Sequence, residues 1–330
     1  MAARSGQKIK LLCMLDILRR YSDEEHPLNA AQICDYLQAR GISAERKAVY
    51  SDLGALGDYG YDIVKTSLPR RGWFLGEREF EIPEIYLLSD AVRTAKFISA
   101  KKTRELIGKL DAMLSEPQAR RREKGIYISG DKCENEEIYY TIDALSRAVE
   151  QKRKVRFQYS VRRLAGREIE HGRKEMLVSP YALTWQDDHY YLIGNYHKYD
   201  NLLHLRLDRM RGVKITEIPA RPFGEVSEYT DRFDVADYTR RLFGMQGGET
   251  CQIELCCEKG ILEQVVDRFS NRIFIKNVTE NTFCFSVDAA VSEALVTWII
   301  NYGGQIEVVS PDFLREKIKA RARAVLARYD

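Results

Sequence analysis

The sequence predicts an α+β protein made of several domains, and three observations lead to this prediction. The chain has 330 residues, about twice the size of a typical domain, and 45% of them are hydrophobic, so it can bury more than one core. Apolar residues follow a mainly helical period up to position 150 and a strand period of two after position 151. After position 248 the expected order is β-α-β-β-α-β, which is typical of a ferredoxin-like domain, here with an added helix.

The composition excludes several classes of protein. The 52 Lys and Arg against 49 Asp and Glu give a net charge of +3, so any basic surface must be local. The seven cysteines are scattered and contain no C-x-x-C pair, which argues against a zinc site or a disulfide framework. We expect them to be reduced, mostly buried and cytoplasmic. No run approaches the ~18 apolar residues that a membrane span needs.

The first part of the chain predicts three helices. The first covers residues 8–21, and the second begins after Asn29 as N-cap and stops at Gly41. Ser43 is the expected N-cap of the third helix, whose apolar stripe is Val49, Leu53 and Leu56. Two helices joined by a short turn that contains glycine are typical of a helix-turn-helix.

The side of the third helix opposite this stripe is polar and lightly basic. A DNA recognition helix needs such a face, because its side chains bond base edges while flanking groups bond phosphates. Strands at 61–65 and 73–75 then predict a hairpin wing. The predicted DNA contacts are Ser43, Arg46, Lys47, Tyr50, Ser51, Arg70 and Arg71. The alternative is a small helical domain that binds protein.

The segment from Gly41 to Leu56, followed by Tyr59 to Ile63, resembles the winged helix of the DeoR-like regulators that carry a WYL domain. The family pattern often has a second arginine before the aspartate, where this chain has Ser51. The resemblance implies that this part of the chain binds double-stranded DNA.

The middle of the chain changes from helices to strands. Residues 80–115 are expected to form packing helices, residues 120–124 a solvated helix end, and residues 138–150 another amphipathic helix. A small antiparallel barrel or sheet should follow, with strands at 155–159, 176–185, 190–196 and 202–210. In the last strand, Leu203, Leu205 and Leu207 should share one face, and His204 and Arg206 the other.

Residues 176–216 look like the core of a WYL domain. The domain is named after a Trp-Tyr-Leu triplet, and this chain has Tyr190 in place of the tryptophan. The resemblance implies an SH3/Sm-like barrel that senses an anionic effector, such as single-stranded DNA or a nucleotide. The residues suit this role, because arginines pair with phosphates and tyrosines stack on bases. Nine bases minus four acids leave +5 over residues 150–175. The predicted ligand site is Tyr159, Tyr181, Tyr190, Tyr191, His204, Arg206 and Arg209.

Simpler roles are open for the same side chains. Strand tyrosines commonly pack in a core, Arg206 or Arg209 can pair with Asp208, and His204 can be a satisfied surface histidine.

The last hundred residues resemble the WCX extension that follows WYL domains, including its Gly-Gly, strand, Ser-Pro, helix ending. The exposed bases of the last helix fit a solvated face or a ligand groove. The sequence thus predicts five parts. They are a winged helix-turn-helix (1–78), a helical linker that helps dimerisation (79–138), the WYL domain (139–220), a connector (221–248) and the C-terminal domain (249–330).

We therefore expect a ligand-responsive, homodimeric transcription regulator in the cytoplasm. The sequence contains no phosphate loop, no H-E-x-x-H helix and no G-x-S-x-G elbow, and its five histidines are dispersed, so no enzyme, metal or cofactor is predicted. One alternative is an accessory nucleic-acid-binding WYL protein of a defence or repair system. The other is an enzyme that acts on nucleotides.

Overall fold

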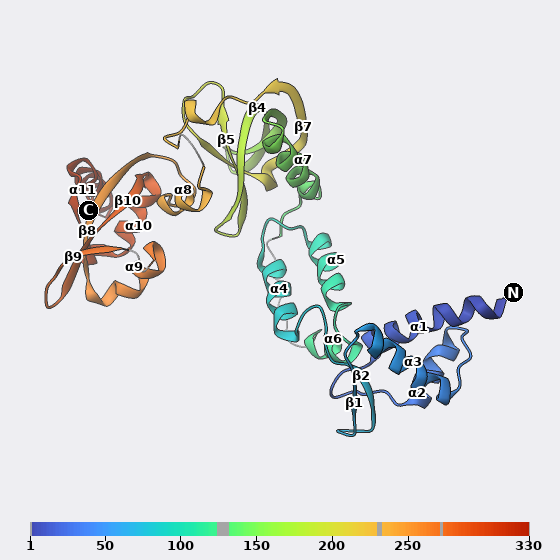
Figure 1. Ribbon diagram of the computed structural model, residues 1–330. Helices are drawn as coiled ribbons and strands as arrows, with labels where there is room; N and C mark the ends of the chain where they lie inside the picture. The colour runs from blue at the N-terminus through green and yellow to red at the C-terminus, as the bar shows by residue number, and fades with distance from the viewer. Residues whose placement is uncertain (1, 124–131, 230–232, 271–272, 330) are drawn as a thin grey trace. The chain divides into compact units, whose positions relative to one another are not determined.

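The computed structural model describes residues 2–123, 132–229, 233–270 and 273–329. The chain is a mixed α/β protein with several antiparallel sheets (Figure 1). It divides into two compact units, residues 1–136 and 137–330. Within the described ranges, no helix has both the length and the apolar character needed to cross a bilayer.

Three helices begin the first unit: α1 (Ala2–Tyr21), α2 (Ala30–Ala39) and α3 (Arg46–Tyr59). Asn29 caps α2 as predicted, because its side chain accepts from the backbone N–H of Gln32 and the Gln32 side chain accepts in return from the Asn29 N–H. The predicted stripe of α3 is buried in the core that the three helices share: Val49, Leu53 and Leu56.

The predicted start of α3 is wrong. Ser43 lies outside the helix, and the carbonyl of Glu45 accepts the first helical hydrogen bond, from Val49. The reason is packing: Ile42 and Ala44 both contact the core, which keeps the chain extended through Glu45.

An antiparallel hairpin follows, made of β1 (Ile63–Thr66) and β2 (Gly72–Leu75). Trp73 exchanges backbone hydrogen bonds with Leu28, at 2.8 and 2.9 Å, and these bonds attach β2 to the segment before α2. Gly72 permits this approach, because a Cβ there would lie 2.7 Å from the Leu28 carbonyl oxygen.

The rest of the first unit is helical, with α4 (Ile82–Thr94), α5 (Ala100–Asp111) and α6 (Glu116–Glu123). The expectation of a solvated helix end at 120–124 holds for Arg120 and Arg121 but is wrong for Arg122. Arg122 is buried and ion-paired with Asp111 of α5, whereas Arg120 and Arg121 are exposed. The difference arises because Arg122 lies on the inner side of α6. Lys124 is outside the described residues.

The second unit begins with a helix and a five-stranded antiparallel sheet in the order β6-β5-β4-β3-β7. The helix α7 packs against β3, β4 and β7 through one buried face (Figure 1). The bounds are α7 (Ile138–Glu150), β3 (Arg153–Ala165), β4 (Glu168–Gln186), β5 (His189–Tyr196), β6 (Leu203–Arg206) and β7 (Met210–Pro219).

The sheet is open, so the predicted closed barrel is not confirmed. No ladder joins the two edge strands β6 and β7, although only the three-residue turn η1 (Leu207–Arg209) separates them in the chain. The single strand predicted over 202–210 is therefore two strands with a turn between them. Leu205 and Leu207 are both buried, which fits the predicted apolar face.

A connector with the short helix α8 (Val235–Arg241) leads to a four-stranded antiparallel sheet in the order β11-β8-β10-β9. Helices α9 and α10 connect its strands, and a large apolar core fills the space between sheet and helices. The bounds are β8 (Glu249–Glu258), α9 (Leu262–Phe269), β9 (Phe274–Val278), β10 (Thr282–Val291), α10 (Glu293–Asn301), β11 (Ile306–Ser310) and α11 (Asp312–Leu326).

The expectation of seven reduced and mostly buried cysteines is wrong. Cys256 of β8 and Cys284 of β10 form a disulfide, because the strand register places them directly opposite each other. Of the others, Cys257 is buried, and the rest are partly exposed: Cys13, Cys34, Cys133 and Cys251.

Candidate functional site

One side of α3 is exposed and carries the predicted DNA contacts. Arg46, Lys47, Tyr50 and Ser51 are all solvent-exposed, while the buried stripe of the same helix faces the core. Exposed Ser43 precedes the helix. The arrangement follows from the helical period, which turns residues three and four positions apart toward one side.

The hairpin lies beside this helix. The Tyr50 ring meets the Trp73 ring of β2 edge-on, with centroids 5.2 Å apart, and Lys65 of β1 lies over Trp73 at 6.0 Å. Of the two arginines at the hairpin tip, Arg70 donates to the Pro27 carbonyl at 3.1 Å. Arg71 is exposed, and within the described ranges no hydrogen bond or ion pair holds it.

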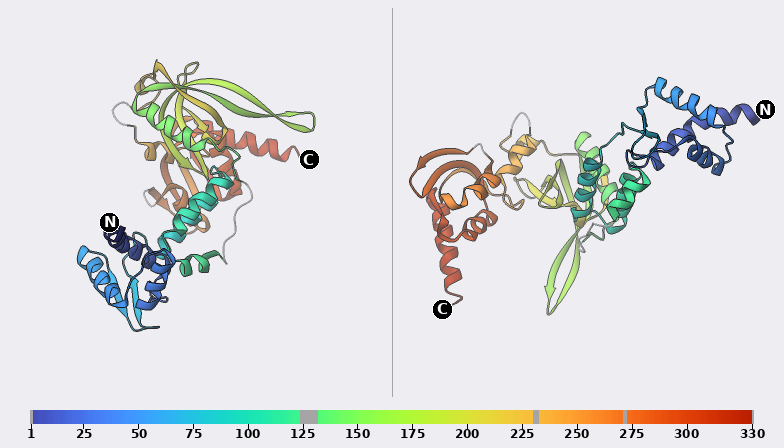
Figure 2. Two further views of the ribbon diagram at one scale, coloured as in Figure 1. Left: turned by 90° about the vertical axis from the view of Figure 1, so that its right-hand side faces the viewer. Right: turned by 90° about the horizontal axis from the view of Figure 1, so that it is seen from below.

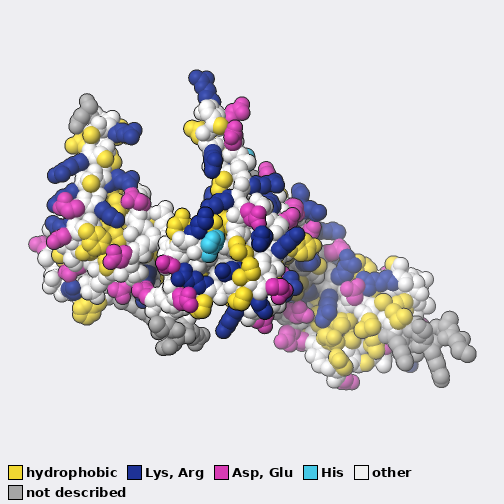
Figure 3. Space-filling view, turned by 90° about the horizontal axis from the view of Figure 1, so that it is seen from above, with side chains coloured by type: hydrophobic (Ala, Val, Ile, Leu, Met, Phe, Trp, Pro, Cys, Tyr) yellow, Lys and Arg dark blue, Asp and Glu magenta, His cyan; other side chains and the backbone are white. Residues whose placement is uncertain are grey.

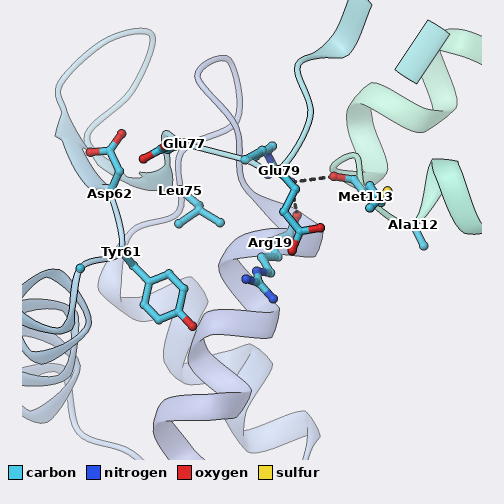
Figure 4. A pocket seen from close by; sticks show the side chains of 10 residues that line it. Arg19, Tyr61, Asp62, Leu75, Glu77, Glu79, Ala112 and Met113 are labelled. Atoms are coloured by element: carbon cyan, nitrogen blue, oxygen red, sulfur yellow. Dashed lines mark hydrogen bonds between the residues drawn. The ribbon is translucent and has the colours of Figure 1, made fainter. Parts of the chain in front are cut away.

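A cavity of about 360 Å³ lies at the base of the hairpin (Figure 4). Arg78 fixes its wall by donating to the carbonyls of Arg19 and Met113, at 3.0 and 3.3 Å. Burial lowers the pKa of Arg78. The acidic side chains of Asp62, Glu77 and Glu79 line the same cavity, so it is poorly suited to an anion.

In the second unit, the middle of β3 meets the end of β6. The Tyr159 hydroxyl accepts a hydrogen bond from the backbone N–H of Arg206 at 3.3 Å. The Arg206 guanidinium donates twice to Asp208, from Nε to Oδ1 at 3.0 Å and from Nη2 to Oδ2 at 2.7 Å. This pair raises the pKa of Arg206. Burial works to raise the pKa of Asp208, but the bonds and charge of Arg206 lower it overall.

Tyr191 and Arg209 complete this cluster. Tyr191 is directly opposite Arg206 in the ladder between β5 and β6, so the two side chains share a face. Burial raises the pKa values of Tyr159 and Tyr191, which keeps both hydroxyls protonated as donors. Arg209, in the turn η1, is near enough to lower the Tyr159 pKa in part. Two tyrosines and two arginines are therefore grouped at one partly exposed edge.

His204 shares this face, but the connector covers it. Its Nε2 and the Tyr238 hydroxyl of α8 are 2.9 Å apart. Burial lowers the pKa of His204 to about 4, so the imidazole is neutral at pH 7. In this arrangement His204 supplies a hydrogen-bonding group to the connector and no positive charge to an anion.

The other two predicted tyrosines lie elsewhere. The Tyr181 hydroxyl donates to the Arg221 carbonyl at 2.9 Å, and its ring meets Phe223 edge-on. Tyr190 is opposite Trp185 in the sheet and points away from the face of Tyr191. The structure thus groups Tyr159, Tyr191, Arg206 and Arg209, with His204 on the same face, and separates Tyr181 and Tyr190 from them.

Asp208 and Tyr238 are the partners that sequence reasoning did not include in the site. The spacing of Arg206 and Asp208 indicated their pairing, but no sequence signal linked Tyr238 to His204 across 34 positions. In the parts of the chain that the structure describes, no cluster of three or more His, Cys, Asp or Glu is arranged to hold a metal ion.

Comparison with known proteins gives two family matches. The model for the WYL domain matches residues 140–215, which span most of α7 to β7, and the model for the WCX domain matches residues 249–326, which span β8 to α11. None of the curated proteins matches. Among solved structures, proteasome accessory factor B/C (PafBC) of Arthrobacter aurescens is similar to 98% of this chain, with 18% identity and a TM-score of 0.28. The match covers 49% of that protein, so this chain spans about half of its length.

The two family matches define a protein with a WYL domain followed by a WCX domain. These two domains are the ones that the resemblance in its sequence implied.

Proposed function

We propose that the chain is a DNA-binding transcription regulator whose WYL domain responds to an anionic effector. The observation that carries the proposal is the exposed polar face of α3, with Arg46, Lys47 and Tyr50, in a chain that also contains a WYL domain. We assign five parts to the chain: a winged helix-turn-helix (1–78), a helical linker (79–138), a WYL domain (139–220), a connector (221–248) and a ferredoxin-like WCX domain (249–330).

In this proposal α3 is the recognition helix and the hairpin is the wing. Ser51 and Lys47 face the base edges, and Ser43 and Arg46 contact phosphates near the start of the helix. The Tyr50 ring packs edge-on against Trp73, so its hydroxyl contacts the phosphate backbone of the DNA from a fixed position. Arg71 extends from the tip of the wing, while Arg70 fixes the wing to Pro27.

The effector site is the cluster of Tyr159, Tyr191, Arg206 and Arg209. Arg206 is partly exposed and pre-oriented by Asp208, so a phosphate or carboxylate can approach its remaining donors. The tyrosines supply ring faces and hydroxyl donors next to it. The effector class is an anion such as single-stranded DNA or a nucleotide.

The connector supplies a route from the effector site to the C-terminal domain. Tyr191 and Ile193 pack in one apolar cluster with Leu242 and Met245 of the connector and Ala290 of β10. A ligand that moves Tyr191 therefore acts on a cluster shared with the WCX domain. In a homodimer with two winged helices on half-sites, a coupling of about 1–3 kcal/mol would be enough to change operator affinity.

The alternative function is an accessory nucleic-acid-binding protein that prefers single strands. The clustered tyrosines and arginines favour it, because stacking platforms with arginines bind single strands without sequence preference. An enzyme that acts on nucleotides is the third class.

Selection of bound fragments from random duplex DNA tests the proposal. We expect enrichment of a two-fold symmetric duplex sequence, and the effect of single-stranded oligonucleotides and nucleotides on its binding should then identify the effector class. Binding confined to single strands would favour the accessory protein, and turnover of a nucleotide would favour the enzyme.

A further inference from the structure

The strands β3 and β4 extend beyond the sheet as a two-stranded arm. Residues 160–165 of β3 and 168–173 of β4 pair only with each other, because β7 stops pairing with β3 at Tyr159 and β5 begins pairing with β4 at Val178. Figure 2 shows this β3–β4 arm as a ribbon that projects from the sheet. Its six residue pairs give a length of about 20 Å, close to the width of a DNA duplex.

The two faces of the arm differ in charge. Residues directly opposite each other in an antiparallel pair share a face, and successive pairs alternate. One face carries Arg173 opposite Ser160, Arg162 opposite His171, and Leu164 opposite Ile169. Both acidic residues of the arm, Glu168 and Glu170, are on the other face. The first face, which we call the basic face, therefore has no carboxylate.

The arginines of the basic face are available for a partner. Arg162 and Arg173 are exposed, as is Arg167 in the turn, and no ion pair or hydrogen bond engages them within the described ranges. Other arginines of this unit are paired with carboxylates: Arg156, Arg206, Arg221, Arg241, Arg315 and Arg321.

An aliphatic pair ends the basic face. Leu164 and Ile169 are 77% and 64% exposed, which is unusual for large apolar side chains that sit side by side. Figure 3 shows the arm as a projection with Lys and Arg side chains at its end and hydrophobic side chains next to them. The arm has the elements of a contact surface, namely free cations on both strands and an apolar end.

We propose that the β3–β4 arm enters a groove of double-stranded DNA, as a contact additional to α3. A two-stranded ribbon fits the major groove of about 12 Å better than the minor groove of about 6 Å. In that position Arg162, Arg167 and Arg173 reach phosphates or guanine edges, and the aliphatic pair contacts thymine methyl groups.

Two other partners fit the arm less well. A single strand needs aromatic platforms for its bases, and residues 160–174 contain no Phe, Tyr or Trp. A second copy that paired through Leu164 and Ile169 would bring the arginines of two basic faces together, and like charges repel.

Affinity for duplex DNA of mixed sequence, about 30 base pairs long, tests the proposal as a function of salt. The full-length triple variant Arg162→Ala/Arg167→Ala/Arg173→Ala should bind on the order of tenfold more weakly near 0.1 M salt. Its slope of log affinity against log salt should be smaller by about 2 to 3, because each lost phosphate contact removes about 0.9. Replacing Leu164 and Ile169 with serine should weaken binding without changing the slope.

The matched control is Lys101→Ala/Arg104→Ala/Lys109→Ala, which removes the same charge from exposed positions of α5 and should leave the slope unchanged. Wild-type affinity and slope in the arm variant would overturn the proposal. So would loss of binding to a single-stranded oligonucleotide with duplex binding intact, because the arm would then contact single strands.

The same titration with Arg46→Ala/Lys47→Ala separates this inference from the proposed function. If only the arm variant weakens duplex binding, α3 is not the recognition helix, and the arm is supported as a DNA contact. If only the α3 variant weakens duplex binding, α3 is supported as the recognition helix, and the arm is not a DNA contact. A wild-type protein that binds no duplex overturns both.

Discussion

Arg206 and Asp208 are two positions apart and form a two-bond ion pair, with N–O distances of 3.0 and 2.7 Å. The pair fixes the guanidinium beside Tyr191, its neighbour across the strands. Because Asp208 takes two of the five donors, three remain for a ligand. The carboxylate therefore orients Arg206 and also opposes a second anion at the same place.

This pairing predicts opposite effects for two substitutions. Arg206→Ala should weaken binding of a single-stranded oligonucleotide or nucleotide by about tenfold or more, because charged hydrogen bonds are lost. Asp208→Asn should strengthen it by about threefold, because a negative charge is removed while one acceptor remains. Equilibrium binding by anisotropy measures both changes.

Lys214→Ala is the control, since Lys214 is an exposed cation on β7. Basal duplex binding should not change in Arg206→Ala, but its response to effector should disappear. A variant that keeps the full response would place the sensor site elsewhere.

The exposed face of α3 predicts a loss of duplex affinity in Arg46→Ala/Lys47→Ala. Two phosphate or base contacts disappear, so the salt slope should fall by up to about 2 and affinity should drop. Gel shift or anisotropy at fixed salt checks the result. Lys101→Ala/Arg104→Ala on α5 removes two exposed charges from the same unit and should have no effect. Equal affinity of the α3 variant and wild type would refute α3 as the recognition helix.

The contact between β2 and the segment before α2 predicts that Gly72→Ala is destabilising. Its Cβ would lie 2.7 Å from the Leu28 carbonyl oxygen, so the Trp73–Leu28 bonds must shift, at a cost of about 1–3 kcal/mol. Amide hydrogen exchange of peptides within residues 9–76 should be faster in Gly72→Ala than in the wild type, because the contact between β2 and the segment before α2 opens more often. Gly57→Ala is the counterpart, because its Cβ would meet no atom within 4 Å and alanine favours a helix. Similar exchange in both variants would contradict the crowding at Gly72.

His204 predicts a local loss of stability in acid. Its pKa is about 4 in the folded protein and about 6.5 when unfolded, so the unfolded segment binds more protons between these values. The contribution to stability is complete above about pH 6.5 and decreases as the pH falls toward 4. From pH 7 to pH 5 the loss is on the order of 2 kcal/mol.

Hydrogen exchange of β6 and α8 at the two pH values measures this loss. His204→Gln keeps a hydrogen-bonding group for Tyr238 but does not titrate, so its protection should change much less with pH. The same pH response in the glutamine variant would show that other groups cause it.

The sequence by itself determined the features that depend on near neighbours. The cap at Asn29, the stripe of Val49, Leu53 and Leu56, and the order of strands and helices along the chain after position 248 were all predicted. Caps and periodic burial involve residues within about four positions, so a local pattern contains the information. The WYL and WCX resemblance was likewise confirmed by the family matches.

Only the tertiary structure decided features that depend on distant residues. It placed Tyr159 against Arg206, which is 47 positions later, and His204 against Tyr238. It also buried Arg122 beside Asp111, and it showed that residues 160–173 of the basic segment form an arm whose two acids, Glu168 and Glu170, lie on one face. Burial and charge pairing depend on which elements pack together. That packing brings together residues that are far apart in the sequence, and no local pattern in the sequence indicates such contacts.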